Sequence, residues 1–268
     1  NRGLKVNKSP IHIFSETLSY EVRTPATLKN NFEEKENFRK LNADLVIVVA
    51  YGHIIPKDLL ELSKYGFINI HASQLPKWRG AAPIQRSLMN QEKETGISIM
   101  KINENLDAGP VMHQDRVKIN ENIDSKILSK LLSQLGAKSI IYSINKIENG
   151  KANFNEQNHK EATYAKKISK KESEIHWNES ARKVLAKING LNPNPGAWFK
   201  YRKERYKVWK AKIAQENGEP GKILSDKLVI GCQDMAIKIV EIQKEGKSKQ
   251  SAEHFLLGNK IKKGEIIN

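Results

Sequence analysis

The chain has 268 residues, which is enough for two domains that each bury a core of their own. It contains no apolar run of about 18 residues or more, so hydropathy excludes a membrane-spanning helix, and we expect no signal peptide. The only cysteine, Cys232, excludes an internal disulfide and a cysteine-rich metal site. We therefore expect a cytoplasmic protein that holds no metal.

The positive charge is concentrated in the last third of the chain. The formal net charge is +16, and residues 166–268 contribute 23 Lys and Arg against 12 Asp and Glu, compared with 23 against 18 in residues 1–165. A basic surface of this kind indicates a polyanionic partner, for which RNA, DNA and an anionic membrane are all candidates. Lysine outnumbers arginine by 37 to 9, so compositional drift is the alternative source of part of the charge.

The first 64 residues contain one strong strand signal. Residues 43–50 read ADLVIVVA, a nearly continuous β-branched run that is typical of a strand buried on both faces in a parallel sheet. Around it we expect, in chain order, a loop at 1–10, an extended piece at 20–25, a polar helix ending at Leu41, a loop at 51–56 and a helix over 56–64 that begins with proline.

Strands and helices alternate through residues 67–149. Buried strands are predicted at 67–71 and 96–102, and a further strand at 111–119. Helices are predicted at 84–90 and, from leucine and isoleucine at helical spacing, at 124–149. This order with short loops predicts an α/β domain over residues 1–149, built on a doubly wound parallel sheet.

The character of the sequence changes after residue 149. Residues 150–170 are polar and lysine-rich without a hydrophobic period, and we interpret them as a linker. A helix is expected over 171–190, followed by short strands at 207–211, 227–231 and 236–242 with glycine-containing turns between them. This pattern predicts that residues 171–268 form a small β-barrel or sandwich, and a small basic barrel would be similar to the OB-fold domains that bind nucleic acids.

Three polar residues that follow predicted strands form the candidate catalytic site. Asn69 and His71 lie on one face of the 67–71 strand, at the C-terminal end where open α/β sheets bind ligands. Asp107 comes 36 residues after His71, at the end of the neighbouring strand, so its carboxylate can hold the imidazole, favour its protonated form and accept a proton through water. Asn69 can donate to a carbonyl oxygen that becomes negative under attack. These groups suit the attack of an amine on an activated one-carbon carbonyl.

Each of these residues also has a purely structural interpretation. An asparagine or a histidine at a strand end is commonly a turn residue or a hydrogen-bonded polar group. Asp107 precedes Ala-Gly-Pro and can fix a turn through its side chain. Spacing alone does not choose between the two interpretations.

Longer motifs around these residues resemble a known family. The segments NIH (69–71), SQLP (73–76) through GAAP (80–83), and LDAG (106–109) resemble the signature of the formyltetrahydrofolate-dependent formyltransferases. The segments WRGAAPIQR (78–86), GLNPNPGAW (190–198) and SAEHFLLG (251–258) resemble the branch of that superfamily that acts on methionyl-tRNA, not its small-molecule relatives. The resemblance covers nearly the whole chain.

The resemblance implies a fold, a site and a reaction. The fold is a Rossmann-like N-terminal domain followed by an OB-like C-terminal domain. The implied reaction moves the formyl group of 10-formyltetrahydrofolate, a co-substrate, to the amino group of methionine on initiator tRNA, in a monomeric enzyme with no membrane partner. The 51–55 loop is expected to contribute to the folate pocket. The implied site residues are Asn69, His71 and Asp107 as catalytic residues, and Ser73, Gln74, Leu75 and Pro76 as the folate-binding loop.

The sequence departs from the family pattern in two places. Gln74 stands where the family usually has leucine, in Ser-Leu-Leu-Pro, which predicts a polar side chain at the pocket rim. The family also begins with about one βαβ unit ahead of Asn1, and a doubly wound sheet places its first strand centrally. We therefore predict either that Asn1 is not the natural start or that the chain has lost function.

Two basic segments are expected to contact RNA. Arg2, Lys5 and Lys8 are predicted to clamp the acceptor stem, with an ordinary solvated loop as the alternative. Trp198 and Trp209 are expected to pack in the core rather than to stack on bases. A second set of basic side chains would hold phosphates and make affinity fall steeply with salt. These are Lys200, Arg202, Lys203, Arg205, Lys207, Lys210 and Lys212.

Two other functions stay open at this point. One is a formyltransferase acting on a small-molecule amine, such as a nucleotide-sugar or glycinamide ribonucleotide, which would leave the basic C-terminal domain without a role. The other is a non-catalytic RNA-binding protein on a decayed scaffold.

Overall fold

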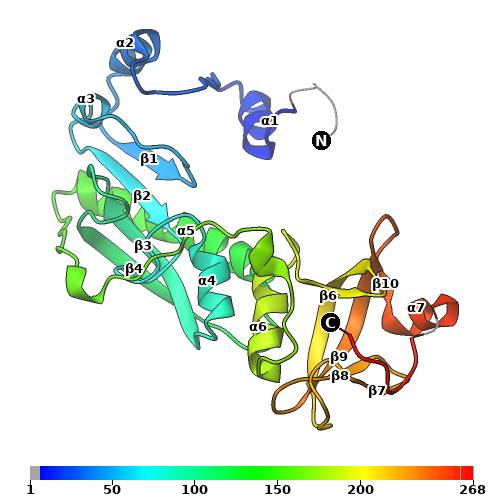
Figure 1. Ribbon diagram of the computed structural model, residues 1–268. Coiled ribbons are helices and arrows are strands. Elements are labelled where there is room, and N and C mark those ends of the chain that lie inside the picture. Colours follow the sequence, from blue (N-terminus) through cyan, green and yellow to red (C-terminus); the bar gives the residue numbers. More distant parts are fainter. Residues whose placement is uncertain (1–6, 260, 268) are drawn as a thin grey trace.

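An N-terminal α/β half and a C-terminal β half lie side by side in the computed structural model, which describes residues 7–259 and 261–267 (Figure 1). The N-terminal half contains α1 (Pro10–Thr17), α2 (Phe32–Leu41), β1 (Val46–Val49), α3 (Lys57–Leu60), β2 (Phe67–His71), α4 (Pro83–Met89), β3 (Glu94–Lys101), β4 (Val111–Lys118) and α5 (Ser125–Glu148). The C-terminal half contains α6 (Ala181–Leu191), β5 (Trp198–Tyr201), β6 (Glu204–Ala214), β7 (Ile223–Ser225), β8 (Val229–Gly231), β9 (Ala236–Lys244), β10 (Gln250–Ser251) and α7 (Ala252–Gly258).

The first sheet has the order β1-β2-β3-β4, and only its β1–β2 pair is parallel. β3 runs antiparallel to both of its neighbours, so the prediction of a doubly wound parallel sheet is wrong, although the α/β class is correct. The reason lies in α4, which has seven residues and rises only about 10 Å. The chain therefore does not return to the start of β2. Instead β3 begins beyond His71, which pairs with Ser98.

Helix α5 covers one face of this sheet. Its buried side chains follow helical spacing, and Leu128, Leu132 and Ile140 pack with Ile97 and Ile99 of β3. Asp124 caps its first turn by accepting from the Ile127 N–H at 2.8 Å. On this face His113 and Asp115 of β4 pair at 2.8 Å, and Ser139 of α5 donates to the same carboxylate. Within the described ranges no helix has both the length and the apolar character that a bilayer crossing requires.

Strand β1 lies at the edge of the sheet and is not buried on both faces as predicted. Ile47 and Val49 are exposed, while Val46 and Val48 are half-buried. Helices α1 and α2 bury no residue. Phe38 of α2 nevertheless stacks on Phe67 of β2, with the ring centroids 5.5 Å apart. Helix α1 begins at the Ser9 cap, at the end of the predicted 1–10 loop, and covers residues for which no element was predicted. No strand forms at 20–25.

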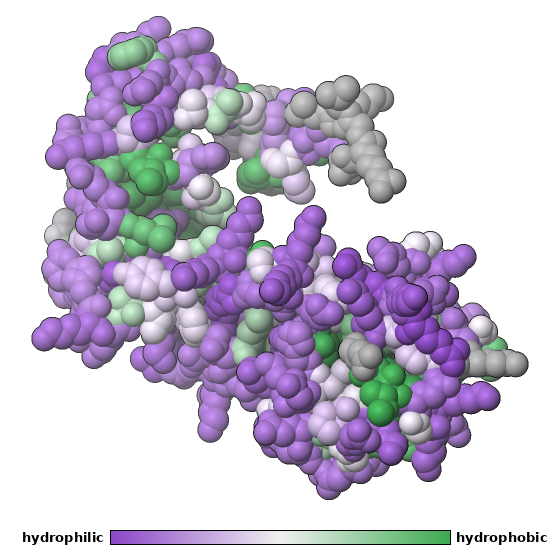
Figure 2. Space-filling view, in the orientation of Figure 1, coloured by the Kyte–Doolittle hydropathy of each residue, from purple (hydrophilic) through white to green (hydrophobic). Residues whose placement is uncertain are grey.

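The C-terminal sheet is antiparallel, with the order β5-β6-β9-β8-β7 and β10 added on β9. Its inner face packs Phe199, Val208 and Ile239 against α6 and against Phe255 of α7. No pairing joins β5 to β7 among the residues that the structure describes, so the expected closed barrel is not confirmed. Hydrophilic side chains cover most of this half on the face shown in Figure 2.

The two halves meet through α4 and α6. A Cβ at Gly190 of α6 would lie 2.7 Å from Met89 Cγ, so glycine permits this close approach of the helices. Arg86 of α4 donates to Glu172 Oε2 at 2.6 Å and to the Lys166 carbonyl. The arginine therefore ties the N-terminal half to the segment that leads into α6, which begins at Ala181 instead of at the predicted residue 171.

Acid should weaken this tie. The hydrogen bond from Arg86 lowers the pKa of Glu172 to about 2 from its usual 4.5, so the stabilisation is complete above about pH 4.5 and is lost as pH falls toward 2. We expect Glu172→Gln to lower the Tm by about 1–3 °C at pH 7 and by less at pH 3.5, because a half-exposed pair is worth little. Thermal melts of both proteins measure the difference. The control is Glu216→Gln, at an exposed glutamate; an equal loss at both pH values for Glu172→Gln would contradict the assignment.

Candidate active site

Asn69 and His71 lie on the face of β2 opposite α5. Their backbones pair with Met100 and Ser98 of β3. Ile70, which lies between them, points the other way, since a Cβ at Gly136 of α5 would be 3.0 Å from its Cγ2. His71 is buried and Asn69 is half-buried. Within the described residues the Asn69 side chain makes no hydrogen bond, so its amide is available to a substrate.

The imidazole of His71 is held at one nitrogen and faces a carboxylate at the other. Its Nε2 lies 2.9 Å from the Trp78 carbonyl oxygen. A carbonyl only accepts, so Nε2 carries a hydrogen and donates it. Its Nδ1 lies 3.6 Å from Asp107 Oδ2, which is an ion-pair distance. Nδ1 is therefore the nitrogen that meets both Asp107 and any substrate beside it.

Asp107 is fixed by the backbone of the basic turn that follows β2. The Gly80 N–H donates to Asp107 Oδ2 at 2.8 Å. The same turn therefore holds both residues: the carbonyl of Trp78 accepts from His71, and the amide of Gly80 donates to Asp107. Gly80 has φ +116°, and a Cβ there would lie 3.0 Å from the Ala165 carbonyl oxygen, so the turn requires glycine.

The loop that carries Asp107 reaches His71 from an unexpected direction. Since β3 is antiparallel to β2, it ends beside the start of β2, where the Ile102 N–H donates to Phe67 O at 2.8 Å. The loop then folds back over the sheet to bring Asp107 to His71. Gly109 allows this path, because a Cβ there would lie 1.9 Å from the Lys101 carbonyl oxygen.

The predicted folate loop, residues 73–76, is tied down on the same face of the sheet as His71. Ser98 Oγ donates to Ser73 O at 2.7 Å and accepts from the Leu75 N–H at 3.0 Å. The Ser73 hydroxyl is buried and donates to Lys77 O at 2.6 Å, so it is not free to bind a ligand. Leu75 and Pro76 line a cavity of about 260 Å³ together with residues 111–114 and 155–158.

Gln74 lines a cavity of about 500 Å³ together with Leu75 and Pro76, and its amide also holds the loop to the sheet. Its Nε2 donates to Asp115 O at 2.7 Å and to Ile97 O at 3.3 Å. A Cβ at Gly96 would lie 2.2 Å from this nitrogen, so the glutamine depends on a glycine in β3. The amide therefore closes a gap between the loop and the sheet.

The 51–55 loop begins next to the site because β1 and β2 are parallel, with Val49 opposite Ile70. Ile54 is 81% exposed at this position. Burial raises the pKa of Tyr51 above its usual value, and its ring lies 5.6 Å from that of His53.

The site also contains residues that the sequence analysis missed. The carbonyl of Trp78 and the amide of Gly80 carry no sequence signal, since every residue has these groups. Arg79 and Gln157 are buried next to Asp107. Arg79 lies in the WRGAAPIQR motif but was assigned no role in the site. Gln157 lies in the segment that was interpreted as a linker.

The outer face of the C-terminal sheet is basic and aromatic. Arg205 lies 4.2 Å from the centroid of the Trp198 ring, and Lys207 lies 4.1 Å from that of Trp209. Both tryptophans are half-buried on this outer face, because they alternate with the core residues Phe199 and Val208, so the prediction that they pack in the core is wrong.

Not every residue of the predicted basic stripe is free to bind a phosphate. Lys207 donates to Pro193 O at 2.8 Å, and burial lowers its pKa. Arg202 pairs with Glu265 at 2.8 Å. Of the predicted N-terminal clamp, Arg2 and Lys5 lie outside the described residues, and Lys8 pairs with Glu16 at 2.6 Å.

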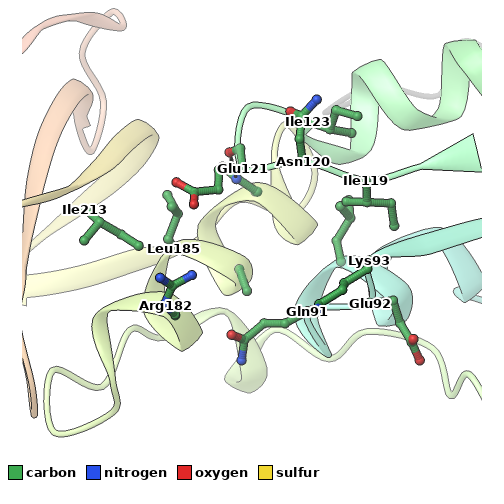
Figure 3. Close-up of a pocket in the computed structure, with 13 residues that line it drawn as sticks. Gln91, Glu92, Lys93, Ile119, Asn120, Glu121, Ile123, Arg182, Leu185 and Ile213 are labelled. Atoms are coloured by element: carbon green, nitrogen blue, oxygen red, sulfur yellow. Dashed lines mark hydrogen bonds between the residues drawn. The ribbon is translucent and has the colours of Figure 1, made fainter.

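A separate cavity of about 470 Å³ lies between the two halves (Figure 3). Arg182 and Leu185 of α6, Gln91 after α4 and Ile213 of β6 are among its lining residues. None of the predicted catalytic residues lines it. The chemistry of Asn69, His71 and Asp107 therefore does not take place there.

The comparisons with known proteins agree with the fold. Residues 2–144 match the family model described as formyl transferase, and residues 167–260 match the model described as formyl transferase, C-terminal domain. The chain belongs to the formyl transferase family, a class of enzymes. Within it, the chain is 54% identical over 267 residues to the methionyl-tRNA formyltransferase of Pelagibacter ubique, which covers 99% of this chain and 86% of that protein.

Two further comparisons extend this result. The methionyl-tRNA formyltransferase of Bradyrhizobium diazoefficiens is 40% identical over 98% of this chain and 86% of its own length. The crystal structure of HypX from Aquifex aeolicus in complex with tetrahydrofolic acid has a TM-score of 0.66 and 18% identity, over 88% of this chain and 43% of that one. At this identity the match to HypX shows the shared fold.

Proposed function

We propose that the chain transfers the formyl group of 10-formyltetrahydrofolate to the amino group of methionyl initiator tRNA, for the initiation of translation. The observation that carries the proposal is the approach of His71 Nδ1 to Asp107 Oδ2 at 3.6 Å, on the sheet face that also presents Asn69. Family membership and the 54% identity to a methionyl-tRNA formyltransferase support the choice of both substrates.

The three residues divide the work of the transfer. When the methionyl amine attacks the formyl carbon, a C–N bond forms and the formyl oxygen gains negative charge. The Asn69 amide and the Nδ1–H of protonated His71 donate to that oxygen. Asp107 faces the imidazole at Nδ1 and takes the amine proton, directly or through water. The folate nitrogen then leaves, and the proton returns to it through the same groups.

The C-terminal half supplies the contact with RNA in this proposal. The basic outer face of β5 and β6 carries Arg205 and Trp198, and the last third of the chain has a large excess of cations. These groups suit phosphates and unpaired bases. We also propose that this half has an OB-like fold. Since all three catalytic residues come from one chain, we also propose a monomer.

A transfer assay tests the proposal. The protein is given labelled 10-formyltetrahydrofolate with methionyl initiator tRNA, or with free amines in parallel. Label is expected only in the tRNA arm, at the methionine amino group. Label in a nucleotide-sugar or glycinamide ribonucleotide alone would favour the small-molecule alternative. If no acceptor becomes labelled but the protein still binds tRNA in a filter assay, the result would favour the non-catalytic RNA-binding protein.

A further inference from the structure

A buried arginine–glutamine pair next to Asp107 has no part in the mechanism above. Arg79 is 3% exposed and Gln157 is 7% exposed. Arg79 Nε and Nη2 both donate to Gln157 Oε1, at 3.0 and 2.7 Å, and Nη2 also lies 3.2 Å from His159 Nδ1. Among the described residues these side-chain partners of the guanidinium are neutral groups or, in the case of histidine, a possible cation. The charge is therefore buried without an acidic partner.

Stability alone is a weak explanation for such a pair. Burying a charge is costly, and a neutral amide repays less of that cost than a carboxylate does. An apolar pair of similar volume would serve the core at least as well. The arrangement thus points to a task that needs the hydrogen-bonding geometry of this arginine and this glutamine.

The geometry of Gln157 leads directly to Asp107. Its Nε2 donates to the carbonyl oxygens of Asp107 and Gly109, at 2.9 and 2.7 Å. Both amide hydrogens are used, and both acceptor sites on Oε1 are taken by Arg79. The amide cannot turn over, because Nε2 would then face the donors of Arg79 and Oε1 would face two carbonyls.

Asp107 needs this support because its backbone is strained. Its φ is +47°, in the left-handed region that side chains other than glycine rarely adopt. Such a conformation persists in a folded protein where the surroundings hold it in place. Here Gln157 holds the carbonyl of Asp107, and Gly80 holds its carboxylate.

The chain segment that carries Gln157 is fastened to the same turn. The Arg79 N–H donates to Thr163 O at 2.9 Å, and the Ala165 N–H donates to Arg79 O at 2.7 Å. Gln157 itself lies between the ranges matched by the two family models, which end at residue 144 and begin again at 167. The support for Asp107 thus comes from the connection between the two halves.

We propose that Gln157 is a positioning residue, which together with Arg79 holds Asp107 in the conformation that presents its carboxylate to His71. The inference rests on the proposed function, since it assigns a role toward the proposed catalytic acid. It makes the segment around residue 157 part of the active site, although no residue of that segment needs to touch substrate.

The test replaces the two N–H donors while keeping the partner of Arg79. Gln157→Glu has the same length and still accepts from the guanidinium, but it places oxygen against the two carbonyls. We expect kcat for methionyl-tRNA to fall by about 10–100-fold, because a small misplacement of a catalytic group has effects of that size. The KM values for both substrates should change by less than about threefold, because the polar atoms of the buried Gln157 side chain are already bonded to Arg79, Asp107 and Gly109.

A double-mutant cycle separates positioning from a general loss of structure. If Gln157 acts through Asp107, Gln157→Glu should change kcat by less than about threefold in an Asp107→Asn background. Asn153→Ala, at an exposed asparagine, is the matched control in the same segment. Gln157→Met replaces Gln157→Glu if melting shows that the latter is unfolded. An unchanged kcat, a change in KM alone, or effects that multiply in the cycle would each overturn the inference. A wild-type protein that formylates no tRNA would instead remove the proposed function.

Discussion

Replacing His71 by alanine is expected to reduce kcat for formyl transfer by about 10²–10⁴-fold, the usual contribution of a positioned acid–base group. The substitution removes the only ring nitrogen that faces Asp107, at 3.6 Å. Binding of formyl-folate should change little, because the interaction with the formyl oxygen strengthens only as charge develops. Single-turnover formylation of methionyl-tRNA measures kcat, and fluorescence titration with folate measures binding.

Because His71 is buried, a second variant separates chemistry from packing. His71→Gln can still donate to the Trp78 carbonyl but cannot carry a positive charge, and we expect it to lose kcat to a similar degree. The matched control is His176→Ala, at an exposed histidine of the C-terminal half. Near-normal turnover in both His71 variants, with normal melting curves, would end the assignment.

Replacing Asn69 by aspartate should lower kcat by about 10²–10³-fold, as the loss of one donor to a developing oxyanion does elsewhere. The new side chain has the same shape, but it donates no hydrogen and brings negative charge toward the oxygen that becomes negative. Asn69 is half-buried and has no hydrogen bond within the described residues, so the fold should tolerate the change. Initial rates at saturating concentrations of both substrates give the result.

The same substitution at an exposed asparagine gives the comparison for this variant. Asn122→Asp lies in the loop between β4 and α5, where the residue is exposed, and it should leave kcat unchanged. If Asn69→Asp mainly raised the KM for folate and kept kcat, Asn69 would be a binding residue, and the oxyanion role would have to pass to another donor.

The sequence predicted the elements of the N-terminal half better than their directions. A β-branched run identifies a strand, but neither periodicity nor length says which way it runs beside its neighbour. The decisive quantity was the reach of α4, since seven residues cannot carry the chain back along the sheet. The run at β1 was also overinterpreted, because its burial depends on neighbours that periodicity does not reveal.

The sequence predicted the side chains of the candidate site but not its backbone groups. Asn69, His71 and Asp107 stood out because polar residues at strand ends are conspicuous, and the structure brings His71 and Asp107 together. The carbonyl of Trp78 and the amide of Gly80 were beyond reach, since backbone groups are common to every residue. Gln157 was missed because a polar segment without a period looks the same whether it is solvated or threaded across a sheet.

The course of the chain between residues 155 and 165 has a practical consequence for protein engineering. A chimera that joins this N-terminal half to the C-terminal half of a relative must keep its junction beyond Ala165, where the last backbone bond to Arg79 is made. Composition suggests a boundary at residue 150. A junction placed there would replace Gln157 and its neighbours, which hold Asp107, with the corresponding segment of the relative. Recombination between family members is therefore constrained by residues 155–165. Their contacts attach them to the N-terminal half, although their composition resembles that of neither half.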